Sequence, residues 1–219
     1  MKIDFVSDVS CPWCAIGLNA LEQALDRVAP EIQATLHFQP FELNPQMPAE
    51  GQDTVEHLSQ KYGIDAAQIA ANAEAIRQRG ASVGFSFGQG QRKRIYNTFD
   101  AHRLLHWAGL VGAGQQRALK HALFKAYFTD GLSPGDHGVL LDAAKTAGLD
   151  GDEAARILAG DSYAAEVRAA EGFYHQQGIS SVPAIIINDR HLISGGQPVE
   201  LFERALRHIA AEGQAGAAA

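Results

Sequence analysis

Cys11 and Cys14 are the two cysteines of the chain, and they stand together in a Cys-Pro-Trp-Cys motif. The nucleophilic form of a cysteine is its thiolate, which the N–H groups at a helix N-terminus stabilise. A spacing of three residues places the second sulfur about one helical turn from the first. The second sulfur then lies close enough to close a disulfide after the first has attacked a substrate. The motif predicts thiol–disulfide exchange, with Cys11 attacking and Cys14 resolving.

Three other interpretations of the cysteine pair are weaker. A zinc site needs four ligands as a rule, and the sequence has no second pair of cysteines, so we expect no metal site. A structural disulfide across two intervening residues closes too short a loop to restrict the unfolded chain appreciably. A chance pair is disfavoured because the motif lies between a predicted strand and a predicted helix.

The elements next to the motif follow a β-α-β order. A β-branched and aromatic run predicts a strand at residues 3–9. Leucines recur at helical spacing after Cys14, and Pro12 suits the first turn of a helix, where its missing N–H loses no partner. Cys11 is therefore expected at or near the N-cap of this helix. Alternation of apolar and polar residues predicts a second strand at residues 36–43.

The end of the chain returns to strands. Two apolar runs, Ala184–Ile187 and His191–Ser194, flank Asn188-Asp189-Arg190, which is typical of a hairpin turn. Residues 198–209 carry apolar positions at helical spacing and predict a final helix.

The middle of the chain is rich in helix-forming residues and shows no fixed-period repeat, which argues against a solenoid. We expect helices at residues 65–79, 98–110, 115–128, 137–147, 153–158 and 161–178. Asp65 and Gln68 form an N-terminal capping pair for the first of these helices, and Asp161-Ser162 is expected to cap the last. The predicted fold class is α/β, with residues 1–50 and 165–212 forming one discontinuous domain. Residues 51–164 form a helical insertion, and residues 213–219 a flexible tail. We expect the insertion to lie as a lid over Cys11 and to select substrates.

Four segments together resemble the FrnE-like branch of the DsbA-type oxidoreductases. They are Ser10–Gly17, Pro40–Pro45, Asn97–Leu104 and Gly178–Pro183, and the likeness extends from about Lys2 to Ile209. The resemblance implies a thioredoxin fold, β-α-β … β-β-α, interrupted by a large all-helical insertion, with a redox-active pair at Cys11 and Cys14.

The resemblance also implies how the groove at the cysteines is shaped. A proline at the first residue of a strand has an ordinary explanation, but the thioredoxin fold keeps a cis-proline at this point. The Val182–Pro183 bond is therefore expected to be cis and to face the active sulfur. Pro12 and Trp13 form the rest of the groove, with Trp13 exposed to partners.

Relatives in the same superfamily supply an alternative function. They include glutathione-dependent 2-hydroxychromene-2-carboxylate isomerases and kappa-class glutathione transferases, in which a serine typically replaces the first cysteine. This chain keeps both cysteines, which favours the redox branch. A glutathione-dependent isomerase or transferase is the second interpretation, and a non-enzymatic binding module the third.

One residue departs from the thioredoxin pattern. Such proteins often carry a buried acid six residues before the nucleophile, which helps to move a proton from the second cysteine. Phe5 holds that position here, with Asp4 and Asp8 on either side of it. The sequence therefore leaves the base for Cys14 unassigned.

Several other residues are candidates for binding substrate. His102 and His106 share a helix face at a spacing that metal sites use, but no third ligand stands at a matching offset, so a structural role is favoured. His102 is alternatively a groove residue that faces Cys11. Asn97 has an adequate explanation as the N-cap of the same helix. Gly195-Gly196 precedes a helix N-terminus, which suits the carboxylate of glutathione, and a tight turn explains the pair equally well.

Composition limits the partners. The 219 residues carry a net charge of −7, which disfavours nucleic acid and anionic membranes, and Arg92-Lys93-Arg94 is interpreted as a solvated loop. No run reaches the roughly 18 apolar residues of a membrane helix, and early acids do not fit a signal peptide. We therefore expect a cytoplasmic, cofactor-free enzyme. Its expected partners are protein or small-molecule thiols and disulfides, with glutathione as a candidate co-substrate.

Overall fold

A four-stranded mixed sheet forms the centre of the protein. The computed structural model describes residues 1–217, and the side chains of residues 1–213. The strand order is β2-β1-β5-β6, with bounds Lys2–Ser7 for β1, Thr35–Pro40 for β2, Ala184–Ile187 for β5 and His191–Ser194 for β6. Strands β1 and β2 are parallel and joined by α1 (Pro12–Val28), while β5 is antiparallel to β1, and β6 to β5. This is the thioredoxin arrangement that the resemblance implies.

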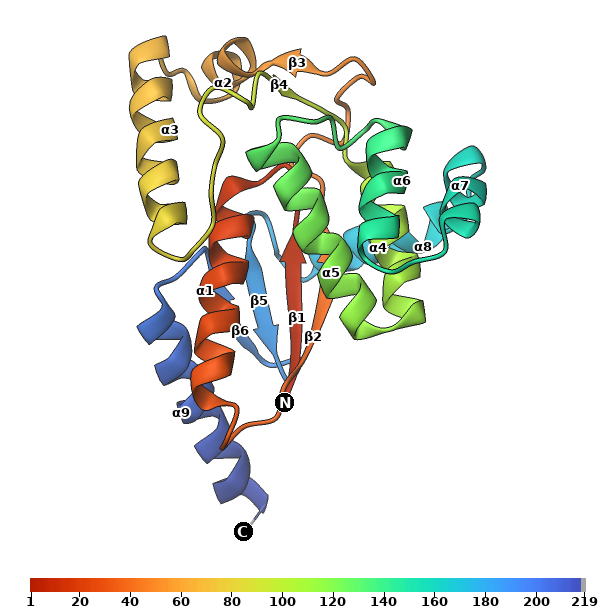
Figure 1. Cartoon of the computed structure of the whole chain (residues 1–219). Coiled ribbons are helices and arrows are strands. Elements are labelled where there is room, and N and C mark those ends of the chain that lie inside the picture. The colour runs from red at the N-terminus through yellow and green to blue at the C-terminus, as the bar shows by residue number, and fades with distance from the viewer. Residues whose placement is uncertain (218–219) are drawn as a thin grey trace.

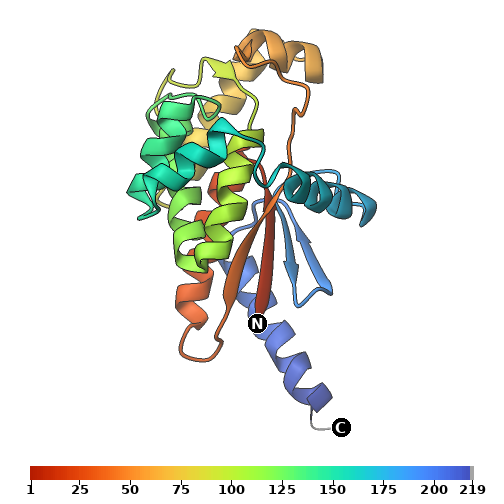
Figure 2. The same ribbon diagram turned by 90° about the vertical axis from the view of Figure 1, so that its right-hand side faces the viewer.

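Alternate residues of the strands face two different helical layers. Ile3 and Phe5 point into the main core, which they share with α1 and with the first half of α9 (Val199–Ala217). Val6 points to the opposite face, where α8 (Ala164–Gln176) covers the sheet (Figure 2). Successive side chains of β1 therefore pack against different layers, and both faces of this strand are buried.

Helix α9 is longer than the sequence pattern indicates. Its apolar positions end at Ile209, but the helix continues to Ala217 and projects beyond the sheet (Figure 1). The predicted flexible tail, residues 213–219, therefore overlaps this helix, and residues 218–219 lie outside the described part of the chain.

The segment between β2 and β5 is mostly helical. Its elements are β3 (Gln52–Asp53), α2 (Thr54–Tyr62), α3 (Ala66–Ala81), β4 (Arg94–Ile95), α4 (Phe99–Val111), α5 (Ala113–Phe124), a π-helical segment (Lys125–Thr129), α6 (His137–Thr146), α7 (Gly151–Ala159) and α8. Helices α4 to α7 enclose a separate apolar core. The short ribbon of β3 and β4, which the sequence pattern missed, lies with α2 beyond the end of the sheet where α1 begins (Figure 1).

Local signals explain most of the helix and turn positions. Asp65 makes the predicted capping box with Gln68 at the start of α3. Asn188 and Asp189 take positive φ angles of 52° and 56°, as the tight turn between β5 and β6 requires.

Two predicted helix ends are wrong. Helix α8 begins at Ala164 after Tyr163, whose φ is 65°, so that Asp161-Ser162 does not cap it. The helix expected at residues 115–128 leaves the α conformation after Phe124 and continues as the π-helical segment. Within the described residues, none of the helices combines the length and apolarity needed to cross a bilayer.

Candidate active site

Cys11 occupies the N-cap of α1. Its carbonyl oxygen accepts hydrogen bonds from the N–H groups of Cys14 at 3.1 Å and Ala15 at 3.4 Å, and Pro12 begins the helix. The Cys11 thiol donates to the Val182 carbonyl oxygen at 3.6 Å. Both cysteines are free thiols; Cys11 is 4% exposed and Cys14 is fully buried. The first sulfur therefore lies nearer to the surface than the second.

The segment before β5 meets the start of α1 at this sulfur. The Val182–Pro183 peptide bond is cis. Trp13, between the two cysteines, is 43% exposed, as a contact surface for partners requires. Pro12, Trp13, Val182 and Pro183 thus lie in or beside the loop and strand ends that surround Cys11.

The predicted glycine pair lies against the same turn of α1. A Cβ on Gly196 would stand 2.9 Å from the carbonyl oxygen of Trp13, and a Cβ on Gly17 would stand 3.1 Å from both Gly196 and Pro183. Gly195 takes a φ of +80° and donates its N–H to the Pro183 carbonyl at 2.8 Å. Close backbone packing therefore explains Gly196, and the positive φ explains Gly195.

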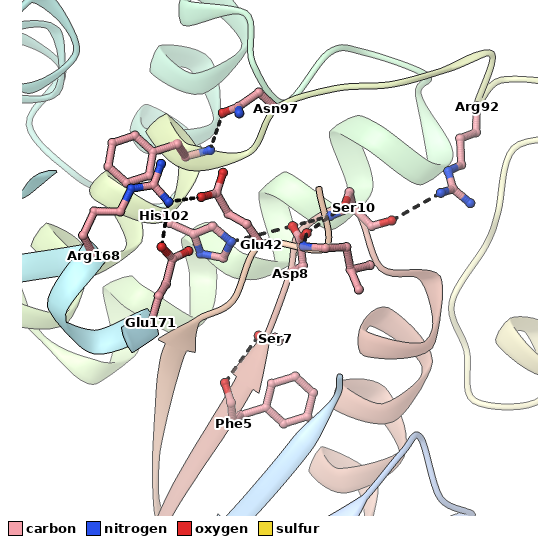
Figure 3. A network of polar contacts seen from close by, with 12 residues as sticks. Phe5, Ser7, Asp8, Ser10, Glu42, Arg92, Asn97, His102, Arg168 and Glu171 are labelled. Carbon is pink, nitrogen blue, oxygen red and sulfur yellow. Dashed lines mark hydrogen bonds and ion pairs between the residues drawn. The ribbon is translucent and has the colours of Figure 1, made fainter. Parts of the chain in front are cut away.

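Asp8 holds the loop that leads into Cys11. Its carboxylate accepts hydrogen bonds from the Ser10 N–H at 3.0 Å, the Ser10 hydroxyl at 2.9 Å and the Leu43 N–H at 2.7 Å (Figure 3). Burial alone would raise the pKa of Asp8. The attraction of the nearby His102 imidazole, with the backbone N–H groups of Leu43 and Ser10, outweighs burial and lowers this pKa to about 2. Asp8 is consequently an anion at any ordinary pH.

His102 lies beside Asp8 and is buried. Its Nε2 is 3.6 Å from an Asp8 carboxylate oxygen, and each side chain is about 1% exposed. Figure 3 shows the imidazole directed at Asp8. His106 instead packs on Tyr163, with ring centroids 5.3 Å apart. Among residues 1–217, no group of three potential ligands is placed to hold a metal ion.

A buried acidic pair lies next to this network. Arg168 of α8 bonds to Glu42, and to Glu171 at 2.8 Å, and stacks 3.7 Å from the Phe99 ring centroid (Figure 3). Burial raises the pKa of both carboxyls, against the attraction of Arg168. The segment after β2 is thereby tied to α8.

Asn97 is not the N-cap of α4. Thr98 holds that position without a side-chain cap, while the Asn97 side chain accepts from the Phe99 N–H at 2.9 Å and donates to the Met47 carbonyl at 3.3 Å. The Asn97 side chain thus accepts a hydrogen bond from the N–H group of the first residue of α4, although Asn97 lies one residue before the N-cap. This role is a local structural one.

Arg92 is a site residue that the sequence pattern missed. Its guanidinium donates to the Ser10 carbonyl at 3.4 Å and to the Tyr127 hydroxyl at 3.1 Å, and Arg94 donates to the carbonyls of Glu50 and Gly51. The interpretation of residues 92–94 as a solvated loop is therefore wrong for Arg92, which is partly buried, whereas Lys93 and Arg94 are exposed. Three adjacent cationic residues in a sequence do not indicate which backbone carbonyls their side chains will bind.

Lys120 is the second missed residue. It is fully buried in α5, and its Nζ lies 5.0 Å from the ring centroid of Phe124 and 6.0 Å from that of Phe38. Burial lowers its pKa to about 8, although attraction to Cys14, Asp8 and Cys11 opposes this change. A lone lysine in an amphipathic helix is ordinarily a surface residue, so the sequence contains no signal for its burial.

Comparison with known proteins identifies the family. Residues 2–207 match the DSBA-like thioredoxin domain. The chain belongs to this family. A probable DsbA oxidoreductase from Streptomyces coelicolor is 33% identical, with a TM-score of 0.90 over 97% of this chain and 91% of that protein. The uncharacterized protein YwbO of Bacillus subtilis is 28% identical over 207 residues, 94% of this chain and 96% of YwbO. A 2-hydroxychromene-2-carboxylate isomerase shares the fold of this DSBA-like chain, with 14% identity and a TM-score of 0.71 over 98% of both chains.

Proposed function

We propose that the protein is a thiol–disulfide oxidoreductase of the FrnE-like branch in which Cys11 attacks and Cys14 resolves. The observation that carries the proposal is the placement of the Cys11 sulfur at the N-cap of α1, 3.6 Å from the Val182 carbonyl, with Cys14 fully buried behind it. A helix N-terminus favours the thiolate, and the adjacent carbonyl offers backbone contact to an incoming chain.

The proposed reaction has two exchange steps. The Cys11 thiolate attacks one sulfur of a substrate disulfide, so that a mixed disulfide forms and the other substrate sulfur leaves as a thiolate. The Cys14 thiolate then attacks the Cys11 sulfur, which closes the Cys11–Cys14 disulfide and releases the second substrate thiolate. The substrate gains two electrons and the protein loses two, and the reverse sequence oxidises a substrate dithiol.

Substrates in this proposal are protein or small-molecule disulfides, with glutathione as a co-substrate and no other cofactor. The cytoplasm is the proposed compartment, since the chain has no cysteines beyond the exchange pair and hence no structural disulfide to maintain. Part of the insertion acts as a lid. In support, Arg92 reaches the Ser10 carbonyl next to Cys11, and α2 with β3 and β4 lies beyond the same end of the sheet.

Two cysteine variants test the proposal. Cys11→Ser should abolish reduction of insulin in the presence of dithiothreitol, because the attacking sulfur is gone. Cys14→Ser should instead accumulate mixed disulfides, visible on non-reducing gels. Equal activity in Cys11→Ser and the wild type would refute the assignment. Full turnover of Cys14→Ser whenever glutathione is supplied would favour the glutathione-dependent isomerase or transferase.

A further inference from the structure

The resolving step needs a way for Cys14 to lose its proton. Cys14 is fully buried, and burial raises the pKa of its thiol well above the ordinary value, with the hydrogen bond and charge of Cys11 adding to the effect. A thiol of this kind is a poor nucleophile until a nearby group favours its ionised form. A group in the buried surroundings of Cys14 must therefore stabilise its thiolate.

The acids near β1 do not fit this role. Phe5, in the main core, holds the position at which thioredoxin-like proteins often have a buried acid. Asp8 is held as an anion by its four contacts and does not take up a proton near neutral pH. Asp4 is engaged by the Gln39 amide at 2.7 Å and by the Lys2 ammonium at 3.0 Å.

Lys120 is the remaining group with the right charge. Its side chain is fully buried, and no group of the described chain lies within hydrogen-bonding distance of its Nζ. The rings of Phe124 and Phe38 lie beside this amine, with centroids 5.0 Å and 6.0 Å from Nζ, and both rings pack in the same core cluster as Cys14. A buried ammonium without a partner is unfavourable for folding. The presence of Lys120 at this buried position therefore points to a function.

The other ionisable groups around Lys120 come from four elements. They are Cys11 and Cys14 at the start of α1, Asp8 after β1, His37 in β2, and His102 and His106 in α4. On its own helix, Arg117 and His121 face away from this group and bind Glu22. When both thiols are protonated, the fixed negative charge near Lys120 is that of Asp8, which is itself engaged with Ser10, Leu43 and His102.

We propose that the Lys120 ammonium stabilises the Cys14 thiolate in the resolving step, in place of the buried acid of thioredoxin-like sites; this role rests on the proposed oxidoreductase function. The attraction is electrostatic and acts across a low-dielectric core, where charges interact more strongly than in water. Lys120 is thus a positioning residue, which acts through its charge and does not touch the reacting sulfurs.

The proton and electron balance of the step is simple. The Cys14 thiol releases its proton to solvent base, and its thiolate stays paired with the ammonium. The thiolate then attacks the Cys11 sulfur, the Cys11–substrate bond breaks, and the substrate sulfur leaves with the electron pair and takes a proton from solvent. Once Cys14 is in the disulfide, Lys120 has lost its partner, and its tendency to release a proton increases.

A cavity connects this region with solvent. It has a volume of about 170 Å³ and is lined by Lys120, His102, Gln116, His37 and other residues of β2 and α4. A polar cavity of this size has room for several water molecules. Water in this cavity would lie against Lys120.

Single-turnover kinetics separate the two exchange steps. Reduced protein mixed with 5,5′-dithiobis(2-nitrobenzoate) should release a coloured thiolate in two phases, the first from attack by Cys11 and the second from resolution by Cys14. The Cys14→Ser variant should show the first phase alone, which assigns each phase to its cysteine. In Lys120→Met the second phase should slow about tenfold near pH 7, because the apparent pKa of Cys14 rises when the ammonium is removed. The difference should vanish at high pH, where the thiolate forms unaided.

Two matched variants control for structural effects. Lys120→Arg keeps the charge and should retain the wild-type pH profile of the second phase. Lys125→Met removes an exposed lysine that pairs with Asp130, and should leave both phases unchanged. Lys120→Met should also raise the denaturation midpoint, since it removes an unpaired buried charge.

The outcomes distinguish this proposal from the proposed function. If the wild type shows no coloured release, the oxidoreductase assignment itself fails. If the wild type shows two phases and Lys120→Met slows the second phase by one constant factor at every pH, or leaves it unchanged, the role of Lys120 is overturned while the function stands.

Discussion

Asp8 and His102 face each other at 3.6 Å, and each side chain is about 1% exposed. Asp8 comes from the end of the first strand and His102 from the helical segment inserted between β2 and β5. The same carboxylate binds the N–H groups of Ser10 and Leu43. One buried charge therefore fixes the loop before Cys11, the segment after β2 and helix α4 relative to one another.

Replacing Asp8 by Asn should make stability less dependent on pH in acid. The folded-state pKa of Asp8 is about 2, below its ordinary value of 3.8, so the unfolded chain binds its proton first as the pH falls. The stability from this group is present above about pH 4 and is lost progressively towards pH 2; the shift corresponds to about 2 kcal/mol. Urea denaturation midpoints of both proteins across this range measure it. An Asp8→Asn difference that is constant from about pH 2 to 7 would contradict the assignment.

His102→Ala should lower stability rather than alter substrate choice. The variant leaves a buried carboxylate with one fewer partner, and such a loss typically amounts to about 1–3 kcal/mol. The ratio of turnover with a small disulfide to turnover with a protein disulfide should stay unchanged, because His102 does not reach the surface. His106→Ala, on the same helix, is the matched control. A changed ratio at unchanged stability would instead support the alternative in which His102 lines the groove.

Gly196→Ala should disturb the site and destabilise the protein by about 1–3 kcal/mol. The added Cβ would stand 2.9 Å from the backbone oxygen of Trp13, which has no freedom to move without shifting the first turn of α1. We expect slower attack by Cys11 and a lower melting temperature. Gly172→Ala is the control: a Cβ there meets nothing within 4 Å, and α8 should gain slightly in stability. Equal effects of the two variants would exclude close packing as the reason for Gly196.

Arg168→Met should destabilise the protein more at pH 8 than at pH 5. Without the guanidinium, Glu42 and Glu171 are two buried carboxyls whose pKa values, already raised by burial, rise further. Their charged forms oppose folding, so stability is lost as the pH rises through the folded-state values. Because Arg168 is itself half exposed, we expect a loss on the order of 2 kcal/mol at the higher pH. Arg156→Met breaks a surface pair with Glu153 and should change little at either pH.

Local sequence signals predicted the order of the elements well. The Cys-Pro-Trp-Cys motif with Pro12 marked the start of α1, Asp65 with Gln68 marked α3, and Asn188-Asp189 marked the final hairpin. Each of these rests on residues close in sequence, where backbone geometry and side-chain capping decide the structure.

The missed features depend on contacts that are distant in sequence. Lys120 is buried by rings from β2 and from the end of its own helix, and Arg92 reaches a carbonyl 82 residues earlier in the chain. The contact of His102 with Asp8 is of the same kind, since it joins helix α4 to the loop after β1. A helical pattern gives the face of a residue but not the partner that this face will meet.

The sequence separation across the site has a consequence for synthesis of the protein. The Cys11 sulfur and the Val182 carbonyl that meet in the folded protein are 171 residues apart in the chain, and β5, which borders β1, follows directly after Val182. At about 5–20 residues per second, a ribosome needs roughly 10–30 s to make the intervening stretch. Throughout that interval β1 has an open edge and the nascent thiol lacks its final surroundings. Translation thus delivers the reactive cysteine well before the strands that complete its site.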